Sequence, residues 1–193
     1  MGRIVVSENV SLDGIMQDPT GEEGFKFGGW FNAMPDDVRA EWAKLEFQEA
    51  LETSAWLIGR RTYNWFVERW ADRPGEWADR LRAIPKYVVS ATLSDAAEWA
   101  NSFVLKGDVV EEVTKLTQAV DGDIVVVGSG PLVQTLMEHD LVGELRLMTH
   151  PFVLGRGERL FREVSDQKAV RLVDVRAIGD CLALLTYQPV RDS

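Results

Sequence analysis

The chain has 193 residues, of which 46% are hydrophobic, and its formal net charge is -10. A chain of this length and composition can bury roughly 70% of its unfolded surface in one core, so we expect a single domain over residues 1–193. The acidic balance argues against nucleic acid or an anionic membrane as a partner held by overall charge, because like charges repel.

The first half of the chain alternates between strand and helix patterns. The hydrophobic period predicts a strand at 3–8, a helix at 35–52, a strand at 55–58 and a short helix at 61–68. A polar stretch containing DRPGEW follows and is interpreted as a helix and turn. KYVVS, residues 86–90, then predicts the next strand.

The second half continues this alternation and ends in a hairpin. A short strand near Phe103 and a helix at 109–120 precede DIVVVG, whose wholly apolar run is typical of a central strand covered on both faces. A helix at 131–139 and the strand ELRLMTH follow. VRLVDVRAI and CLALLTYQP are joined at Gly179-Asp180, which predicts a hairpin turn. These elements predict an α/β fold with a mostly parallel central sheet and a C-terminal antiparallel hairpin.

Cysteine and histidine are scarce in this chain. A lone Cys181 forms no intrachain disulfide, and His139 and His150 are too far apart in sequence to form a ligand cluster for zinc, so we expect no metal. The start MGRIVVSENV has no secretory pattern, and no apolar run approaches the ~20 residues of a membrane span. We therefore expect a cytoplasmic protein with no membrane partner.

A glycine-rich turn follows the predicted central strand, in VVVGSGPLVQTL. A helix beginning at Pro131 would point its free N–H groups and the positive end of its dipole at one spot, which favours a phosphate. Since Pro131 lacks an N–H, the expected donors are Ser129, Gly130 and Leu132. The alternative is a tight turn that binds nothing, because the third glycine of a G-x-G-x-x-G fingerprint is missing.

The segment IGRRT has the same order of strand, glycine and helix, and it places Arg60 and Arg61 in the first helical turn. Cations there oppose the helix dipole at a cost of roughly 0.3–1 kcal/mol each, which a bound anion would offset. The alternative is two solvated surface arginines. Ser90 and Thr92 add hydroxyls just past a third strand. Because parallel strands end at one edge of a sheet, the three strand ends can converge on one elongated, phosphorylated ligand.

Five motifs, in this order and at similar spacing, resemble the dihydrofolate reductase superfamily: VVSENVSLDGIMQD, LIGRRTYNWF, YVVSATL, VVVGSGPLVQTL and LRLMTHPFVLGRGERLF. The resemblance runs over about residues 3–187. It is greatest to the branch related to the C-terminal reductase domain of bifunctional riboflavin-biosynthesis proteins. It implies a three-layer dihydrofolate-reductase-like fold and an NADPH-dependent reductase activity.

The resemblance also implies which residues hold the cofactor NADPH. The Arg and Thr of GRRT and the Ser of VVS match residues that hold the adenosine 2'-phosphate, and the turn after VVVG matches the triple glycine that cradles the pyrophosphate. In dihydrofolate reductases the first peptide link of that turn is cis, and the serine in the middle of the turn here leaves the state of this link open. The expected cofactor-binding residues are Gly59, Arg60, Thr62, Ser90, Thr92, Gly128, Ser129, Gly130 and Leu132.

Reduction of a nitrogen also requires a proton, and two aspartates are the catalytic candidates. Asp13, in SLDG after the first strand, stands where pyrimidine reductases of the family carry an aspartate. Asp37, in MPDDV, matches the acid that grips the pterin in dihydrofolate reductases, although the chain from there to Gly59 is several residues longer. The alternatives are a turn-capping role for Asp13 and a helix-dipole role for the acids of the first helical turn.

Trp30 and Thr149 are the candidate substrate-binding residues. Trp30 lies in GEEGFKFGGWFN, a glycine-hinged aromatic loop that could close over the nicotinamide; in the alternative, Phe27 and Trp30 pack into the core. Thr149 matches, by the resemblance, a threonine near the substrate's amino group. Its neighbour His150 is interpreted as packed or hydrogen-bonded rather than catalytic.

The sequence thus predicts an NADPH-dependent oxidoreductase that reduces a C=N or carbonyl bond of a small heterocycle. The resemblance favours a pyrimidinone or pteridine substrate and a 5-amino-6-(5-phosphoribosylamino)uracil reductase-like role in riboflavin biosynthesis. The alternatives are dihydrofolate reduction and a non-catalytic nucleotide-binding module. We also expect a homodimer, because the resemblance suggests one and CLALLTY offers an apolar edge that needs cover.

Overall fold

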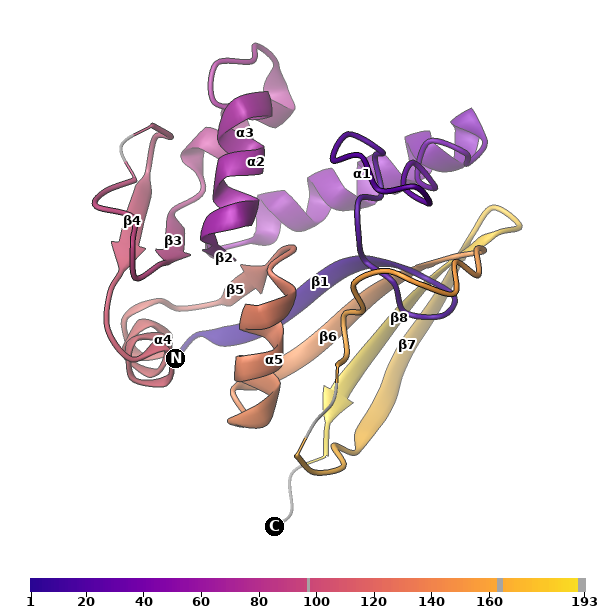
Figure 1. Cartoon of the computed structure of the whole chain (residues 1–193). Helices are drawn as coiled ribbons and strands as arrows, with labels where there is room; N and C mark the ends of the chain where they lie inside the picture. The colour runs from indigo at the N-terminus through magenta and orange to yellow at the C-terminus, as the bar shows by residue number, and fades with distance from the viewer. Residues whose placement is uncertain (97, 163–164, 191–193) are drawn as a thin grey trace.

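One eight-stranded sheet runs through the structure. The computed structural model describes residues 1–96, 98–162 and 165–190. The strands are β1 (Arg3–Ser11), β2 (Ala55–Gly59), β3 (Lys86–Val89), β4 (Ser102–Leu105), β5 (Asp123–Val126), β6 (Val142–His150), β7 (Val170–Ile178) and β8 (Leu182–Pro189). Their order across the sheet is β4-β3-β2-β5-β1-β6-β8-β7 (Figure 1).

The pairing directions confirm a mostly parallel sheet with an antiparallel end. From β4 across to β6 all neighbouring strands run parallel, whereas β8 pairs antiparallel with both β6 and β7. β5 lies between β2 and β1, and its residues Ile124, Val125 and Val126 are buried. The apolar run DIVVVG therefore supplies a central strand covered on both faces, as its composition indicates.

Helices cover both faces of this sheet. They are α1 (Asp36–Glu52), α2 (Arg60–Trp70), α3 (Glu76–Ala83), α4 (Val109–Ala119) and α5 (Gly130–Glu138). Side chains alternate along a strand, so Ile4 and Val6 of β1 pack in one apolar cluster with α4 and α5, whereas Val5 packs in another with α1, α2 and α3. In Figure 1, α1 and α5 accordingly lie on opposite sides of the sheet. The three-layer fold is thus confirmed. Of the helices in the described ranges, none combines the length and the apolar composition that crossing a membrane requires.

The C-terminal hairpin corrects one expectation. CLALLTY was expected to form the apolar edge of the sheet, but β8, which contains most of it, lies between β6 and β7. The chain passes the position beside β6, forms β7 further out, and reverses at Gly179, whose φ of +58° favours glycine. The outer strand is therefore β7, on which Leu172, Val173 and Val175 are 50%, 45% and 58% exposed.

Candidate functional site

A cavity of about 740 Å³ opens at the carboxyl ends of β1, β2 and β5. Its wall includes Glu8 and Asn9 of β1, Gly59 at the end of β2, and the turn 127–131 after β5. The first turns of α2 and α5, the loop 16–20 and part of α1 also line it. Ligands of open α/β sheets bind at this edge, so the cavity is the candidate functional site.

The turn after β5 is held in a left-handed conformation. Gly128 and Ser129 have φ values of +61° and +63°, and the peptide link between them is trans. A Cβ atom at Gly128 would lie 2.7 Å from Thr62 Oγ1, so both the backbone and the space require glycine at this position. Ser129 stands where the resemblance expects a glycine. Its side chain joins the turn after β5 to the turn after β2.

Ser129 Oγ links the two strand-end turns that the sequence singled out. It accepts a hydrogen bond of 2.8 Å from the backbone N–H of Gly59 and lies 3.0 Å from Thr62 Oγ1. The predicted convergence of the ends of β2 and β5 is therefore present, and a direct hydrogen bond from the serine holds it. Gly59, Thr62 and the whole turn from Gly128 to Gly130 line the cavity.

The N–H groups of this turn differ in availability. Within the described residues, those of Ser129 and Gly130 donate to no protein acceptor outside the helix ladder. The N–H of Leu132 donates to Ser129 O at 2.8 Å, so its expected role as a free donor was wrong, because the tight turn at the start of α5 uses it internally. Arg162 also lines the cavity, and its Nη2 lies 3.9 Å from where a Cβ of Gly130 would stand. No sequence pattern singled out this cation, which lies in an irregular segment far along the chain.

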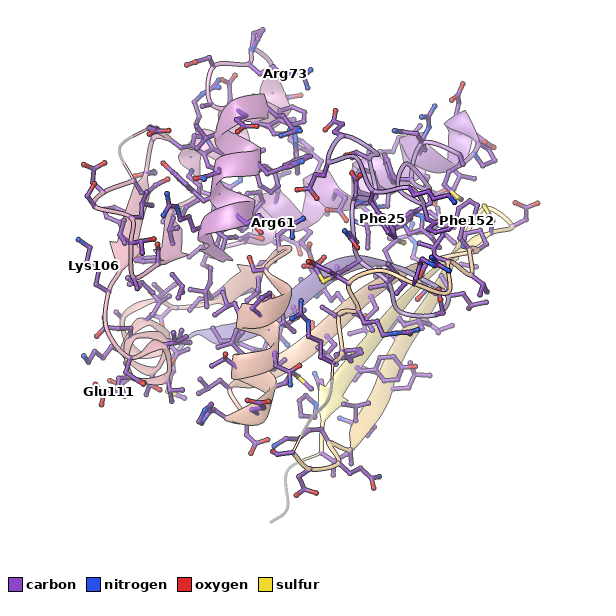
Figure 2. All side chains as sticks on the ribbon, in the orientation of Figure 1. Phe25, Arg61, Arg73, Lys106, Glu111 and Phe152 are labelled. Carbon is purple, nitrogen blue, oxygen red and sulfur yellow. The ribbon has the colours of Figure 1, made fainter. Side chains whose placement is uncertain are left out.

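The two arginines of GRRT have different surroundings. Arg61 pairs with Glu23 at 3.0 Å and with Glu158 at 3.3 Å, so its charge is already neutralised. Figure 2 shows it between the foot of α2 and the loop that carries Phe25. Arg60 is exposed and, among the described residues, has no carboxylate partner. Of these two arginines, Arg60 is the one whose charge is left available to a bound anion.

Two predicted hydroxyl residues lie beside Arg60. Arg60 Nη1 donates a hydrogen bond of 2.6 Å to Thr92 Oγ1. Ser90 Oγ accepts hydrogen bonds from the backbone N–H groups of Thr92 and Leu93, at 3.3 and 3.0 Å, and so fixes the turn that presents Thr92. Neither Ser90 nor Thr92 is among the described residues that line the cavity. They lie next to Arg60, which does line it, and form a polar rim there.

The two candidate catalytic aspartates lie outside the described wall of the cavity. Asp13 accepts hydrogen bonds from Ser11 Oγ at 2.7 Å and from the backbone N–H groups of Leu154 and Gly155 at 3.1 and 2.8 Å. These bonds, led by that of Ser11, lower the pKa of Asp13 to about 2, which makes it a poor proton donor. Asp37 is exposed in the first turn of α1. Their catalytic roles stay predictions, and the geometry favours a structural role for Asp13.

Among the described residues, Trp30 and Thr149 are not part of the cavity wall. Trp30 is only 3% exposed and packs edge-on against His150, with ring centroids 4.8 Å apart. His150 is buried, its Nε2 lies 2.9 Å from Asn9 Oδ1, and desolvation lowers its pKa to about 4. It is thus the packed, hydrogen-bonded residue that the sequence suggested. Thr149 lies within β6, opposite Val10 on β1.

Two carboxyl groups on the cavity wall were missed in the sequence. Glu8 on β1 is 8% exposed, and Glu46 on α1 is partly exposed. Desolvation, followed by the charge of Glu46, raises the pKa of Glu8 well above its ordinary value. Desolvation, followed by the charge of Glu49, raises the pKa of Glu46 to about 8. A lone acidic residue in VVSENV, between the apolar residues Val6 and Val10 of the first strand, was the signal that could have identified Glu8.

The fold and the motifs agree with a known protein family. Residues 3–184 match the family model described as the RibD C-terminal domain. The chain belongs to the RibD C-terminal domain family. A curated relative in this comparison is the uncharacterized protein YyaP of Bacillus subtilis strain 168. It is 28% identical over 191 residues, which cover 96% of this chain and 94% of the relative.

Solved structures place this member of the RibD C-terminal domain family among dihydrofolate-reductase-like folds. A putative riboflavin biosynthesis protein from Shewanella sp. PV-4 superposes with a TM-score of 0.75 at 21% identity, covering 98% of this chain and 99% of the other. A pyrimidine reductase-like protein from Corynebacterium diphtheriae superposes with a TM-score of 0.67 at 11% identity, covering 98% of this chain and 92% of the other. The dihydrofolate reductase from Enterococcus faecalis complexed with NADP(H) superposes with a TM-score of 0.58 at 15% identity, covering 97% of this chain and 96% of the other. At these identities the likeness shows the shared fold.

Proposed function

We propose that the protein is an NADPH-dependent reductase of a small heterocyclic substrate, of the pyrimidinone or pteridine type, with a role related to riboflavin biosynthesis. The observation that carries this proposal is the pair of turns that Ser129 joins at the cavity, beside an Arg60 that has no carboxylate partner among the described residues. Family membership supports it, as do two structural neighbours that are named as a riboflavin biosynthesis protein and a pyrimidine reductase-like protein.

The residues around the two turns fit the phosphates of a dinucleotide. The pyrophosphate would be held by the backbone N–H groups of Ser129 and Gly130 and by the cation of Arg162. A side chain larger than that of glycine at Gly128 would fill this turn. Arg60, with Thr92 beside it, would hold the 2'-phosphate. When bound, the dihydronicotinamide supplies a hydride, which no protein side chain can supply.

The position of the acids favours a pyrimidinone over dihydrofolate. Asp37, the expected match to the pterin-gripping acid, is exposed at the start of α1, whereas Glu46 reaches the cavity from a later turn of the same helix. A substrate held at Glu46 would lie differently from a pterin held at the helix start. Dihydrofolate reduction is therefore the less favoured of the two activities.

Titration with NADPH tests the proposed cofactor. We expect saturable quenching of tryptophan fluorescence, because Trp42 and Trp65 line the cavity, and we expect oxidation of NADPH in the presence of a pyrimidinone or pteridine substrate. Gly128→Ala should abolish the quenching, because its Cβ would enter the turn against Thr62. Gly155→Ala is the matched control, since Gly155 has a similar φ of +74° but open space around a Cβ. Wild-type protein that does not bind NADPH would contradict the proposal.

We propose further that two copies of the chain associate through β7. In the part of the chain that the structure describes, no strand pairs with the outer edge of β7, and Leu172, Val173 and Val175 on this strand are at least 45% exposed. This combination favours association with another chain. Light scattering should give about twice the 21.7 kDa of one chain at micromolar concentration. Val175→Lys should return the mass to that of one chain, because a charge on an edge strand opposes pairing. A single-chain mass for the wild type would rule out this dimer.

A further inference from the structure

Glu8 is a carboxyl group that the fold leaves inside the cavity without a full set of partners. It lies on β1 two residues beyond Val6, the last β1 residue that pairs with β5, so the neighbouring strand has ended at its position. Its side chain is 8% exposed, and its Oε1 has no hydrogen-bond partner among the described residues. Because leaving a buried acceptor unpaired costs about 1–3 kcal/mol, such a group indicates a ligand that completes it.

The charged groups that face Glu8 come from the helix packed over β1 and from the turn after β5. α1 contributes Glu46 and Glu49, and the backbone N–H of Gly128 in the turn acts to lower the pKa of Glu8. Glu49 is bound by Arg146 on β6 at 2.9 Å, and the charge of Glu46 raises the pKa of Glu8 more than that of Glu49 does. The other charged side chains of the cavity wall are Asp18, Glu23, Arg60, Arg61, Glu158 and Arg162.

Building on the proposed reductase function, we propose that Glu8 binds the reacting nitrogen of the substrate and donates the proton to it, so that the cavity selects a heterocycle presenting an N–H or a basic ring nitrogen at its inner end. The unpaired Oε1 accepts a hydrogen bond from such a nitrogen when the substrate carries N–H, and the carboxyl O–H donates to it when the nitrogen is bare. A carboxylate or phosphate is disfavoured at this end of the substrate, because burial there penalises negative charge, as it does for Glu8 and Glu46.

The proposed step balances in atoms and electrons. A C–H bond forms at the carbon of the C=N group with the hydride of the dihydronicotinamide, the π bond breaks toward nitrogen, and an N–H bond forms as the O–H bond of Glu8 breaks. The substrate is reduced by two electrons, the cofactor is oxidised, and Glu8 is left as a carboxylate that regains its proton from water. Burial and the charge of Glu46 raise the pKa of Glu8, so the carboxyl keeps its proton until the step requires it.

Binding of benzamidine tests the nitrogen-binding role without any cofactor. Benzamidine presents paired N–H donors with a positive charge, and benzamide is its neutral analogue. Calorimetry should show benzamidine binding to the wild type about 10- to 150-fold more tightly than to Glu8→Gln, the worth of a charge-assisted hydrogen bond. The cation should also displace the proton of Glu8, so the heat of binding should depend on the ionisation enthalpy of the buffer. Benzamide should bind both proteins alike.

Unfolding at two pH values provides a second readout on the protein alone. The folded-state pKa of Glu8 lies above its unfolded value, so its stability contribution is present below the unfolded pKa and is lost as pH rises through the folded pKa. Glutamine does not ionise, so Glu8→Gln does not undergo this loss. The free energy of unfolding of the variant minus that of the wild type should therefore be larger at pH ~9 than at pH ~5. Glu52→Gln, the same change at an exposed position of α1, should show no such gain.

The outcomes separate this inference from the cofactor assignment. With a substrate that turns over, Glu8→Gln should lower kcat/KM about 10²- to 10⁴-fold while leaving the Kd of NADPH unchanged. Glu46→Gln should move the loss of activity at high pH to a lower pH, because it removes the neighbouring charge. If benzamidine binding depends on Glu8 but NADPH does not bind, the reductase proposal fails and the nitrogen site stands. Equal benzamidine affinity for wild type and Glu8→Gln overturns the role of Glu8.

Discussion

Replacing Arg146 with methionine is expected to lower the free energy of unfolding by about 3–5 kcal/mol at neutral pH, because it leaves part-buried carboxylates without their cation. Arg146 binds Glu49 at 2.9 Å, and Asp123 and Glu144 at 2.8 Å each. Arg3 also reaches Asp123 and Glu144, but among the described residues it makes no ion pair with Glu49. The variant therefore leaves three acids on neighbouring elements with one cation.

Denaturant unfolding of the variant checks this result, with Arg176→Met as the control. Arg176 pairs with Glu41 at 3.4 Å, and both side chains are about half exposed, so its loss should cost no more than about 1 kcal/mol. A loss in Arg146→Met no larger than in this control would contradict the expected role of the network.

Acid should narrow the gap between the wild type and Arg146→Met. Burial acts to raise the pKa of Asp123, but hydrogen bonds from Arg3 and Arg146 outweigh it and lower the pKa. A carboxyl with a lowered folded pKa contributes stability above its unfolded value of roughly 3.9, and that contribution is lost as pH falls through the folded pKa. The difference in unfolding free energy should therefore be largest at neutral pH and shrink below pH ~4.

Replacing Arg60 with alanine is expected to remove most of a preference for NADPH over NADH. If Arg60 holds the 2'-phosphate, the wild type should bind NADPH about 10- to 150-fold more tightly than NADH, the worth of a charge-assisted contact of roughly 1.5–3 kcal/mol. The fold should be unaffected, because Arg60 is exposed and, among the described residues, its side chain hydrogen-bonds Thr92 alone.

Arg61→Ala is the matched control for this experiment. Arg61 follows directly in the same helical turn, but Glu23 and Glu158 already neutralise it, so its removal should change the preference less. Both cofactors should be titrated into the three proteins at two salt concentrations, since an ionic contact weakens as salt rises. Equal affinity of the wild type for NADPH and NADH would contradict the 2'-phosphate assignment.

The sequence by itself determined the elements and the outline of the phosphate-facing turns. The apolar run at 124–126 is typical of a strand covered on both sides, and it lies in the central β5. Glycine followed by a helix start predicted the turns at Gly59 and Gly128, and both lie at the cavity. These features are local: side-chain period, glycine conformation and helix termini are properties of a few consecutive residues.

Only the tertiary structure decided which side chains are engaged and which are left free. GRRT shows two equal arginines, and Arg61 is neutralised by Glu158, which lies 97 residues along the chain. Asp13 resembled a catalytic acid, but the backbone N–H groups of Leu154 and Gly155 hold its charge. Glu8 was one acid in an apolar strand until the end of β5 and the packing of α1 enclosed it. Desolvation and charge pairing depend on what surrounds a group in space, and residues distant in sequence supply those surroundings.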